Sequence, residues 1–124
     1  MPLDPNAVPG LLRALDSHDV FVRITAAEAL GKIGNPVAIQ RLAATYDDPR
    51  ANVRRRVVRA FERIGVEPKA NVAAQVVPGL ARALDDPDLQ VQAAAVAALR
   101  RLDISSGWAA LEAWETRDTD GGGT

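Results

Sequence analysis

One pattern of residues recurs three times along this chain, and such an internal repeat limits the fold to one that stacks similar units. Residues 8–11 (VPGL) return as residues 77–80, and residues 13–16 (RALD) return as residues 82–85. A more divergent copy at residues 39–47 lies 31 positions after the first and 38 positions before the third. Repeats of this length are typical of solenoids, in which each unit buries its apolar surface against its neighbours.

Each unit is predicted to be a pair of helices. In the first helix of each pair, apolar residues recur at i, i+3, i+4 and i+7, which places them on one helical face. The stripe in the first unit is Val8, Leu11, Leu12 and Leu15, with counterparts that begin at Ile39 and Val77. The second helices begin their stripes at Val22, Val53 and Val91 and include small alanines. No segment has the alternation of a β-strand, so we expect an all-α fold, an α-α superhelix of about three helix pairs plus a C-terminal capping helix.

The predicted repeat domain covers residues 1–116. Its units are residues 4–34, 36–65 and 71–103, followed by a half-unit at residues 105–116, in which Ser105 or Ser106 caps a last helix over residues 108–115. Trp108, Leu111 and Trp114 fall on one edge of that helix and are expected to cover the third unit, because a solenoid needs a lid on its apolar end. Residues 117–124 are expected to be a disordered tail.

Short polar and glycine signals mark the helix ends. Asp48 and Asp86 each precede a proline and are predicted to be N-caps of second helices. Gly34 and Gly65 are predicted to end second helices in the left-handed conformation.

The overall composition indicates a cytoplasmic protein without catalytic or metal chemistry. Fifteen basic residues against sixteen acidic ones give a net charge of -1, so no overall field favours nucleic acid, and no apolar run approaches the ~20 residues of a membrane span. The chain has no cysteine, and its single histidine, His18, lies on a predicted turn. We therefore expect no enzyme activity, no cofactor and no metal site.

The recurrent turn resembles a known repeat family. The string Leu-x-Asp-Pro-x-x-x-Val-Arg, followed by Ala-x-x-Leu, is approximated by residues 46–54, 84–92 and 15–23. It resembles the HEAT-like repeat of the phycobilisome-lyase (E-Z) type, over residues 8–114. The resemblance implies a solenoid that serves as a scaffold, an adaptor or an accessory subunit of an enzyme. It does not extend to the deoxyhypusine hydroxylases, whose repeats need several His-Glu pairs to hold iron.

The resemblance also implies a structural ladder between units. In HEAT-type repeats an Asp after the first helix commonly pairs with an Arg early in a neighbouring second helix. The matching acidic positions are Ser17, Asp48 and Asp86, and the matching basic positions are Arg23, Arg54 and Gln92. If each Arg reaches the next unit's Asp, the pairs are Arg23–Asp48 and Arg54–Asp86. The uncharged residues then stand at the two ends, where no partner is needed, so we expect this direction.

A local excess of arginine suggests where a partner binds. Residues 49–64 contain six arginines and one glutamate. The helical period directs Arg55, Arg59 and Arg100 toward the expected concave face, with Arg56, Arg63 and Arg101 on the flank beside it. We expect this face to dock a protein partner with an acidic surface, since Arg pairs carboxylates bidentately. The alternative is a solvated helix face with no binding role.

Two other functions are compatible with the sequence. Nucleic-acid binding through the same arginines is ranked lower, because no aromatic residues lie among them for base stacking. A role as accessory subunit of a chromophore lyase or other modifying enzyme follows from the resemblance alone. The sequence leaves the partner and the oligomeric state open.

Overall fold

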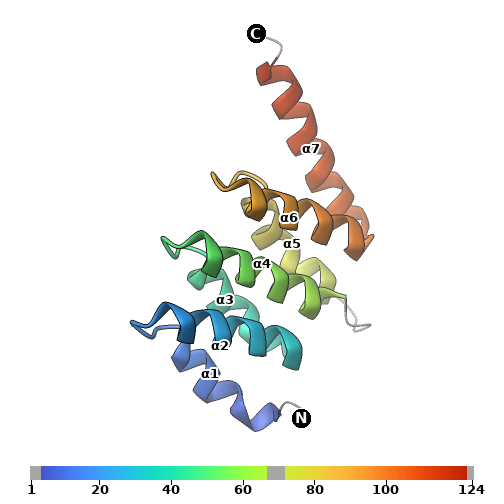
Figure 1. Cartoon of the computed structure of the whole chain (residues 1–124). Helices are drawn as coiled ribbons and strands as arrows, with labels where there is room; N and C mark the ends of the chain where they lie inside the picture. Colours follow the sequence, from blue (N-terminus) through green and yellow to red (C-terminus); the bar gives the residue numbers. More distant parts are fainter. Residues whose placement is uncertain (1–3, 67–71, 123–124) are drawn as a thin grey trace.

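The computed structural model describes residues 4–66 and 72–122, and every regular element within them is helical. The elements in chain order are η1 (Pro5–Ala7), α1 (Val8–Ala14), α2 (Val20–Ile33), η2 (Pro36–Ala38), α3 (Ile39–Thr45), α4 (Ala51–Gly65), α5 (Val72–Ala83), α6 (Leu89–Leu102) and α7 (Ser105–Gly122). The helix pairs α1/α2, α3/α4 and α5/α6 follow one another in a stack, and α7 lies at its far end (Figure 1). The predicted all-α solenoid of three helix pairs plus a C-terminal helix is confirmed.

The second helices form the more tightly packed layer of the stack. Helix α4 packs against both α2 and α6, whereas the first helices α1, α3 and α5 contact one another less. One close approach explains why α2 and α4 pack so well. A Cβ atom built on Gly31 would lie 2.8 Å from the Cα of Ala60, so only glycine lets the two helices come this near.

The core is a continuous apolar seam between the two layers. Its largest fully buried side chains include Leu30 from the first unit, Phe61 from the second and Leu99 from the third. The predicted stripe is less covered in α2 than in α4 and α6. Val22 is 39% exposed, while its counterparts Val53 and Val91 are fully buried.

Several helix ends differ from the sequence prediction. Helices α4 and α6 begin at Ala51 and Leu89, with Arg50 and Asp88 as their N-caps. Asp48 and Asp86 are therefore not N-caps. Instead they accept hydrogen bonds from the backbone N–H groups two residues later, at 2.9 and 2.8 Å.

The two predicted glycine stops have different roles. Gly34 ends α2 in the left-handed region, with φ 76°, as the sequence predicts. Gly65 is the last residue of α4, and Val66 after it stays right-handed. A Cβ on Gly65 would lie 2.7 Å from atoms of Leu102 and Val76, so the missing side chain at this position serves packing.

The C-terminal helix is longer than expected. Helix α7 begins at Ser105 and continues to Gly122, where the sequence predicts a helix over residues 108–115 and a disordered tail from residue 117. Residues 108–120 contain neither glycine nor proline, so nothing in the chain breaks the helix before Gly121. Residues 123 and 124 lie outside the described part of the chain. Leu111 is buried and Trp114 packs on the core, so the first half of α7 covers the third unit, while the second half projects from the stack (Figure 1).

Candidate functional site

The structural ladder has the direction that the sequence predicts. Arg23 Nε lies 2.7 Å from Asp48 Oδ2, and Arg54 Nε lies 2.8 Å from Asp86 Oδ2. The Arg54 contact is bidentate, since its Nη2 also donates to Asp86 Oδ1 at 3.1 Å. Each arginine thus joins its own unit to the following one.

The residues at the basic ladder positions, Gln92 included, also donate a hydrogen bond to a backbone carbonyl of their own unit. Arg23 Nη1 and Arg54 Nη1 each donate to the carbonyl oxygen six residues earlier, of Ser17 and Asp48, at 2.9 Å. Gln92 Nε2 donates in the same way to the carbonyl oxygen of Asp86, at 2.8 Å. Gln92 of the third unit therefore keeps the hydrogen bond within its unit, but it has no charge with which to form an ion pair.

Asp86 is the most enclosed charged residue of the ladder. Its side chain is 1% exposed and also accepts a hydrogen bond from the Tyr46 hydroxyl. Burial acts to raise the pKa of Asp86, but hydrogen bonds from Arg54, Tyr46 and the Asp88 backbone outweigh it and leave the pKa lowered. Burial, together with the hydrogen bond to Asp86, raises the pKa of Tyr46 above its ordinary value of 10.0.

A second, exposed ladder runs beside the first, and sequence reasoning missed it. The aspartates at residues 16, 47 and 85 each pair with an arginine of the following helical unit, in the pairs Asp16–Arg41, Asp47–Arg82 and Asp85–Arg117. Arg82 also lies over the ring of Tyr46, 4.9 Å from its centroid. The recurrence of Asp at one position of the repeat was the available signal for this ladder. Its arginine partners occupy non-equivalent positions of the units, so the repeat alone could not identify them.

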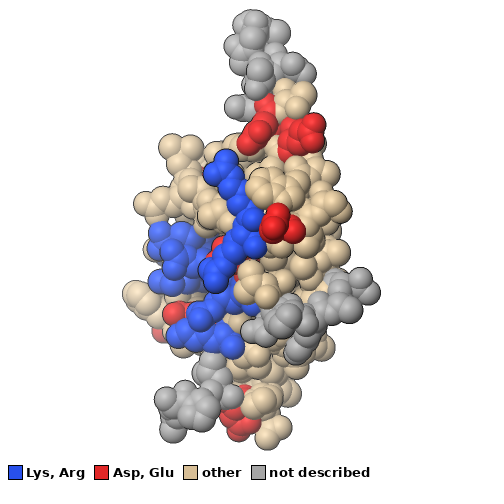
Figure 2. Space-filling model, turned by 90° about the vertical axis from the view of Figure 1, so that its right-hand side faces the viewer, with Lys and Arg blue, Asp and Glu red and all other residues tan. Residues whose placement is uncertain are grey.

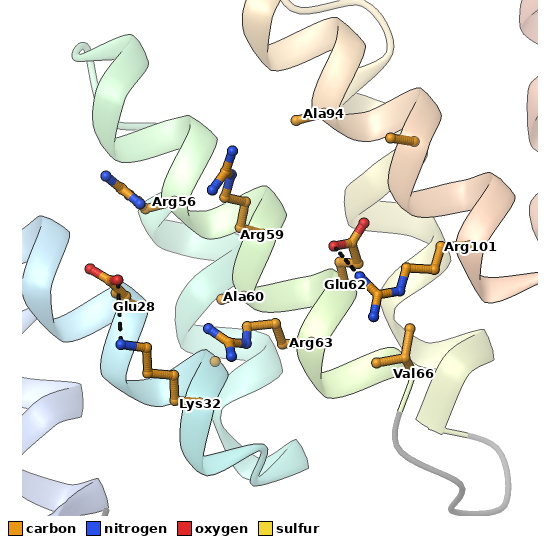
Figure 3. Close-up of a pocket in the computed structure, with 12 residues that line it drawn as sticks. Glu28, Lys32, Arg56, Arg59, Ala60, Glu62, Arg63, Val66, Ala94 and Arg101 are labelled. Atoms are coloured by element: carbon orange, nitrogen blue, oxygen red, sulfur yellow. Dashed lines mark ion pairs between the residues drawn. The ribbon is translucent and has the colours of Figure 1, made fainter. Parts of the chain in front are cut away.

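The candidate binding site is a hollow of about 620 Å³ across the second helices. We call it the basic groove. Helices α2, α4 and α6 supply its walls, and small residues such as Ala60 and Ala94 lie among the charged side chains (Figure 3). Its lining consists of Glu28, Gly31, Lys32, Arg56, Arg59, Ala60, Glu62, Arg63, Val66, Ala94, Ala97 and Arg101.

The basic groove carries a net positive charge. Five of its side chains are basic and two are acidic, and Lys32–Glu28 and Arg101–Glu62 are long ion pairs of 3.5 and 3.6 Å. Among the side chains that the structure describes, no carboxylate pairs with the remaining three, Arg56, Arg59 and Arg63. On the same side of the stack, Figure 2 shows Lys and Arg side chains in a continuous band that runs along the units.

The groove contains some of the predicted contact residues and not others. Arg59, Arg56 and Arg63 line it, but Arg55 and Arg100 do not. Arg55 is half-buried and donates to Gln90 Oε1 of the next unit at 2.5 Å. The predicted face is therefore rotated slightly from the hollow, because the close packing of α2 on α4 sets which side of α4 remains open.

One basic residue of the groove, Lys32, could not be recognised from the helical period alone. Lys32 and Arg101 both occupy the repeat position of Arg63, at spacings of 31 and 38 residues. Aligning all three units at this position was the signal that could have found Lys32.

The structure offers no metal or membrane feature in the part that it describes. No group of three or more His, Cys, Asp or Glu side chains in residues 4–66 and 72–117 is arranged to hold a metal ion. Of the helices described, none combines the length and apolar character needed to cross a membrane.

Comparison with known proteins supports a HEAT-like repeat in the first part of the chain. A family model described as HEAT repeats matches residues 3–62, which span the first two helix pairs almost to the end of α4. No curated protein matches the chain. HEAT repeats generally serve as protein-interaction or scaffold modules. The match, the stacked helix pairs and the ladder between them together support a HEAT-like repeat protein.

Proposed function

We propose that this protein is a non-catalytic binding module that docks an acidic segment of a protein partner in the basic groove. The observation that carries the proposal is the charge of the groove, in which five basic side chains face two acidic ones. Arg56, Arg59 and Arg63 have no carboxylate partner among the described side chains. Their guanidinium groups are available to bind carboxylates, which they can do bidentately.

The lining of the groove favours protein over nucleic acid. Single-stranded nucleic acid is usually held by aromatic side chains on which bases stack. The twelve residues that line the groove include no aromatic residue. The groove therefore offers charge but no stacking surface, which suits a carboxylate-bearing segment better.

A binding role also accounts for the groove better than catalysis does. None of its lining residues is Ser, Thr, Cys or His, so they provide neither a hydroxyl or thiol nucleophile nor an imidazole base. Glu28 and Glu62 are both engaged with cations of the groove. The resemblance to the phycobilisome-lyase type adds a narrower form of the proposal, in which the partner is another subunit of a modifying enzyme.

The test is a titration of the protein with a fluorescent 20-residue polyglutamate peptide, followed by anisotropy. We expect binding that the double variant Arg59→Glu/Arg63→Glu weakens tenfold or more, because like charges then oppose the peptide. The matched control is Arg13→Glu/Arg50→Glu, which reverses two exposed arginines outside the groove and should keep most of the wild-type affinity.

Two results would reject the proposal. One is equal weakening by the groove variant and the control, which would mean that only net charge matters. The other is tighter binding of a single-stranded RNA of equal charge than of the peptide, which would assign the groove to nucleic acid.

A further inference from the structure

The last turn of each second helix carries a basic residue at the same position of the repeat. Lys32, Arg63 and Arg101 lie in the last turns of α2, α4 and α6. All three line the basic groove. Because α4 packs between α2 and α6, the three side chains form one row that crosses the groove from α2 to α6 (Figure 3). We call this the basic row.

The packing of the helices gives an expected spacing for the basic row. Packed helices lie about 8–10 Å apart, so we take about this interval as the spacing between the backbone positions of the row. Gly31 against Ala60 keeps α2 and α4 close together. A partner that contacts every member of the row therefore needs anionic groups on one side at the same interval.

One extended conformation has that period. A polyproline II segment has three residues per turn and rises about 3.1 Å per residue, so every third side chain lies on the same side at intervals of about 9.3 Å. In a β-strand, side chains on one face recur about every 6.6 Å. In an α-helix, the same-face residues i+4 and i+7 lie about 6 and about 10.5 Å from residue i along the axis, below and above the interval of the row. The polyproline II period matches the row and the other two do not.

We propose that the basic groove recognises an extended, polyproline II-like acidic segment that runs along the stack and bears a carboxylate at every third residue. Each carboxylate meets one member of the basic row, and Arg56 and Arg59 add positive charge beside it. This inference rests on the proposed function. It adds the spacing of the carboxylates and the conformation of the bound segment.

The two glutamates of the groove give the site its selectivity. Their ion pairs with Lys32 and Arg101 are long and the cations are 44% and 67% exposed, so these pairs are weak and open to competition. Glu28 and Glu62 remain beside the bound segment. They oppose carboxylates at the intervening positions, since like charges at close range discriminate against a wrong partner.

The register is tested with three capped 12-residue peptides of identical composition, four each of Glu, Pro and Gln. The first has Glu at every third position, the second has Glu at every second position, and the third has four consecutive Glu. We expect the first peptide to bind at least about tenfold more tightly than the other two. Equal affinities for all three would overturn the register while leaving the proposed function intact. No binding of any of them, or of polyglutamate, would overturn both.

Two double variants test which cations of the groove recognise the spacing of the glutamates in the peptide. In Lys32→Gln/Arg101→Gln, the preference for the first peptide should fall to within about twofold. In Arg56→Gln/Arg59→Gln, all three affinities should fall while the preference remains, because these residues lie outside the row. The opposite pattern would instead assign the groove to a partner aligned with α4. Circular dichroism and the Tm of each variant confirm that it is folded.

The glutamates provide a test in which binding should improve. Glu28→Gln/Glu62→Gln frees Lys32 and Arg101 and removes the repulsion, so affinity should rise for all peptides, most for the peptide with consecutive Glu. Glu112→Gln, an exposed position on α7 outside the groove, is the control and should change little. Unchanged affinities in the double variant would contradict the selective role of the two glutamates.

Discussion

At the scale of single residues, the two rungs of the structural ladder are not equal. Asp48 is partly enclosed and binds Arg23 and the Arg50 backbone N–H. Asp86 is buried and receives Arg54, the Tyr46 hydroxyl and the Asp88 backbone N–H. A buried carboxylate is tolerated only with such partners, since desolvation of an unpaired charge costs several kcal/mol. The second rung therefore fixes the register between units two and three more strictly than the first rung does between units one and two.

We predict that Asp86→Asn lowers the free energy of unfolding by about 3–5 kcal/mol, because it removes the buried carboxylate that pairs with the partly buried Arg54 guanidinium. Asp48→Asn should cost less, about 1.5–3 kcal/mol, the usual value for a hydrogen bond to a charged group. Urea denaturation followed by circular dichroism measures both. A larger loss for Asp48→Asn than for Asp86→Asn would contradict the unequal rungs.

The first rung can be tested by a double-mutant cycle of Arg23→Gln and Asp48→Asn. Glutamine is the natural residue at the equivalent position of the third unit, where Gln92 keeps the bond to the backbone carbonyl. Arg23→Gln should therefore remove the ion pair and little else. We expect a coupling energy of about 0.5–3 kcal/mol, as for residues in direct contact. Strict additivity of the two single variants would show that the contact does not stabilise the fold.

The lowered pKa of Asp86 predicts how stability depends on pH. The folded pKa lies below the unfolded value of about 3.9, so the contribution of Asp86 is fully present above that value and is lost as the pH falls through the folded pKa. The Tm difference between wild type and Asp86→Asn should therefore be constant near neutral pH and shrink below about pH 4. A difference that is unchanged down to pH 2 would contradict the shift.

At the scale of elements, missing side chains set how closely the helices approach. A Cβ on Gly31 would meet the backbone of Ala60, and one on Gly79 would lie 2.6 Å from Cε2 of Phe61. Backbone cannot move aside as a flexible side-chain end can. The contact at Gly31 is therefore the less adaptable of the two, and it determines the separation of α2 and α4 that the basic groove depends on.

We predict that Gly31→Ala destabilises the protein by about 1–3 kcal/mol, the usual cost of overpacking. Gly10→Ala is the matched control, because a Cβ there meets no atom nearer than 3.7 Å. In the helix α1 the control should stabilise by about 0.5–1 kcal/mol, since alanine favours helix over glycine. Thermal denaturation of both variants measures the two changes in stability. Equal effects of the two substitutions would mean that the close approach places no constraint on the fold.

At the scale of the whole molecule, the protein is a linear stack in which each unit depends on its neighbours. Helix α4 is packed by α2, α3, α5 and α6, whereas α1 packs mainly on η1 and α2. In such arrays stability is roughly a sum of unit and interface contributions, so the ends open more easily than the middle. The basic groove draws on all three second helices, and binding therefore requires that the units stay stacked.

We predict a gradient of native-state amide hydrogen exchange along the chain. The amides of α4 should exchange most slowly, and those of α1 and of the projecting second half of α7 most rapidly. Exchange followed by NMR or mass spectrometry gives the order. Uniform protection from α1 to α6 would instead indicate a single cooperative unit.

The sequence alone was sufficient for the architecture, and its resemblance to HEAT-type repeats implied the pairing of the ladder. The repeat identifies equivalent positions, and the helical period assigns each to a face, so the all-α solenoid follows without coordinates. The direction of the pairs Arg23–Asp48 and Arg54–Asp86 follows from the uncharged residues at the two ends, Ser17 and Gln92. These features depend on local spacing and on repeat order, which a one-dimensional sequence contains.

Only the tertiary structure decided which cations share the groove. The period alone could not separate Arg55, which binds Gln90, from Arg56, which lines the hollow. That choice depends on the rotation of α4 against its neighbours, and the close contact of Gly31 with Ala60 helps to set this rotation. The packing role of Gly65 was also visible only in three dimensions, because it depends on atoms of α5 and α6. Interhelical distance and rotation arise from the fit of many side chains at once, and for this reason no single position in the sequence encodes them.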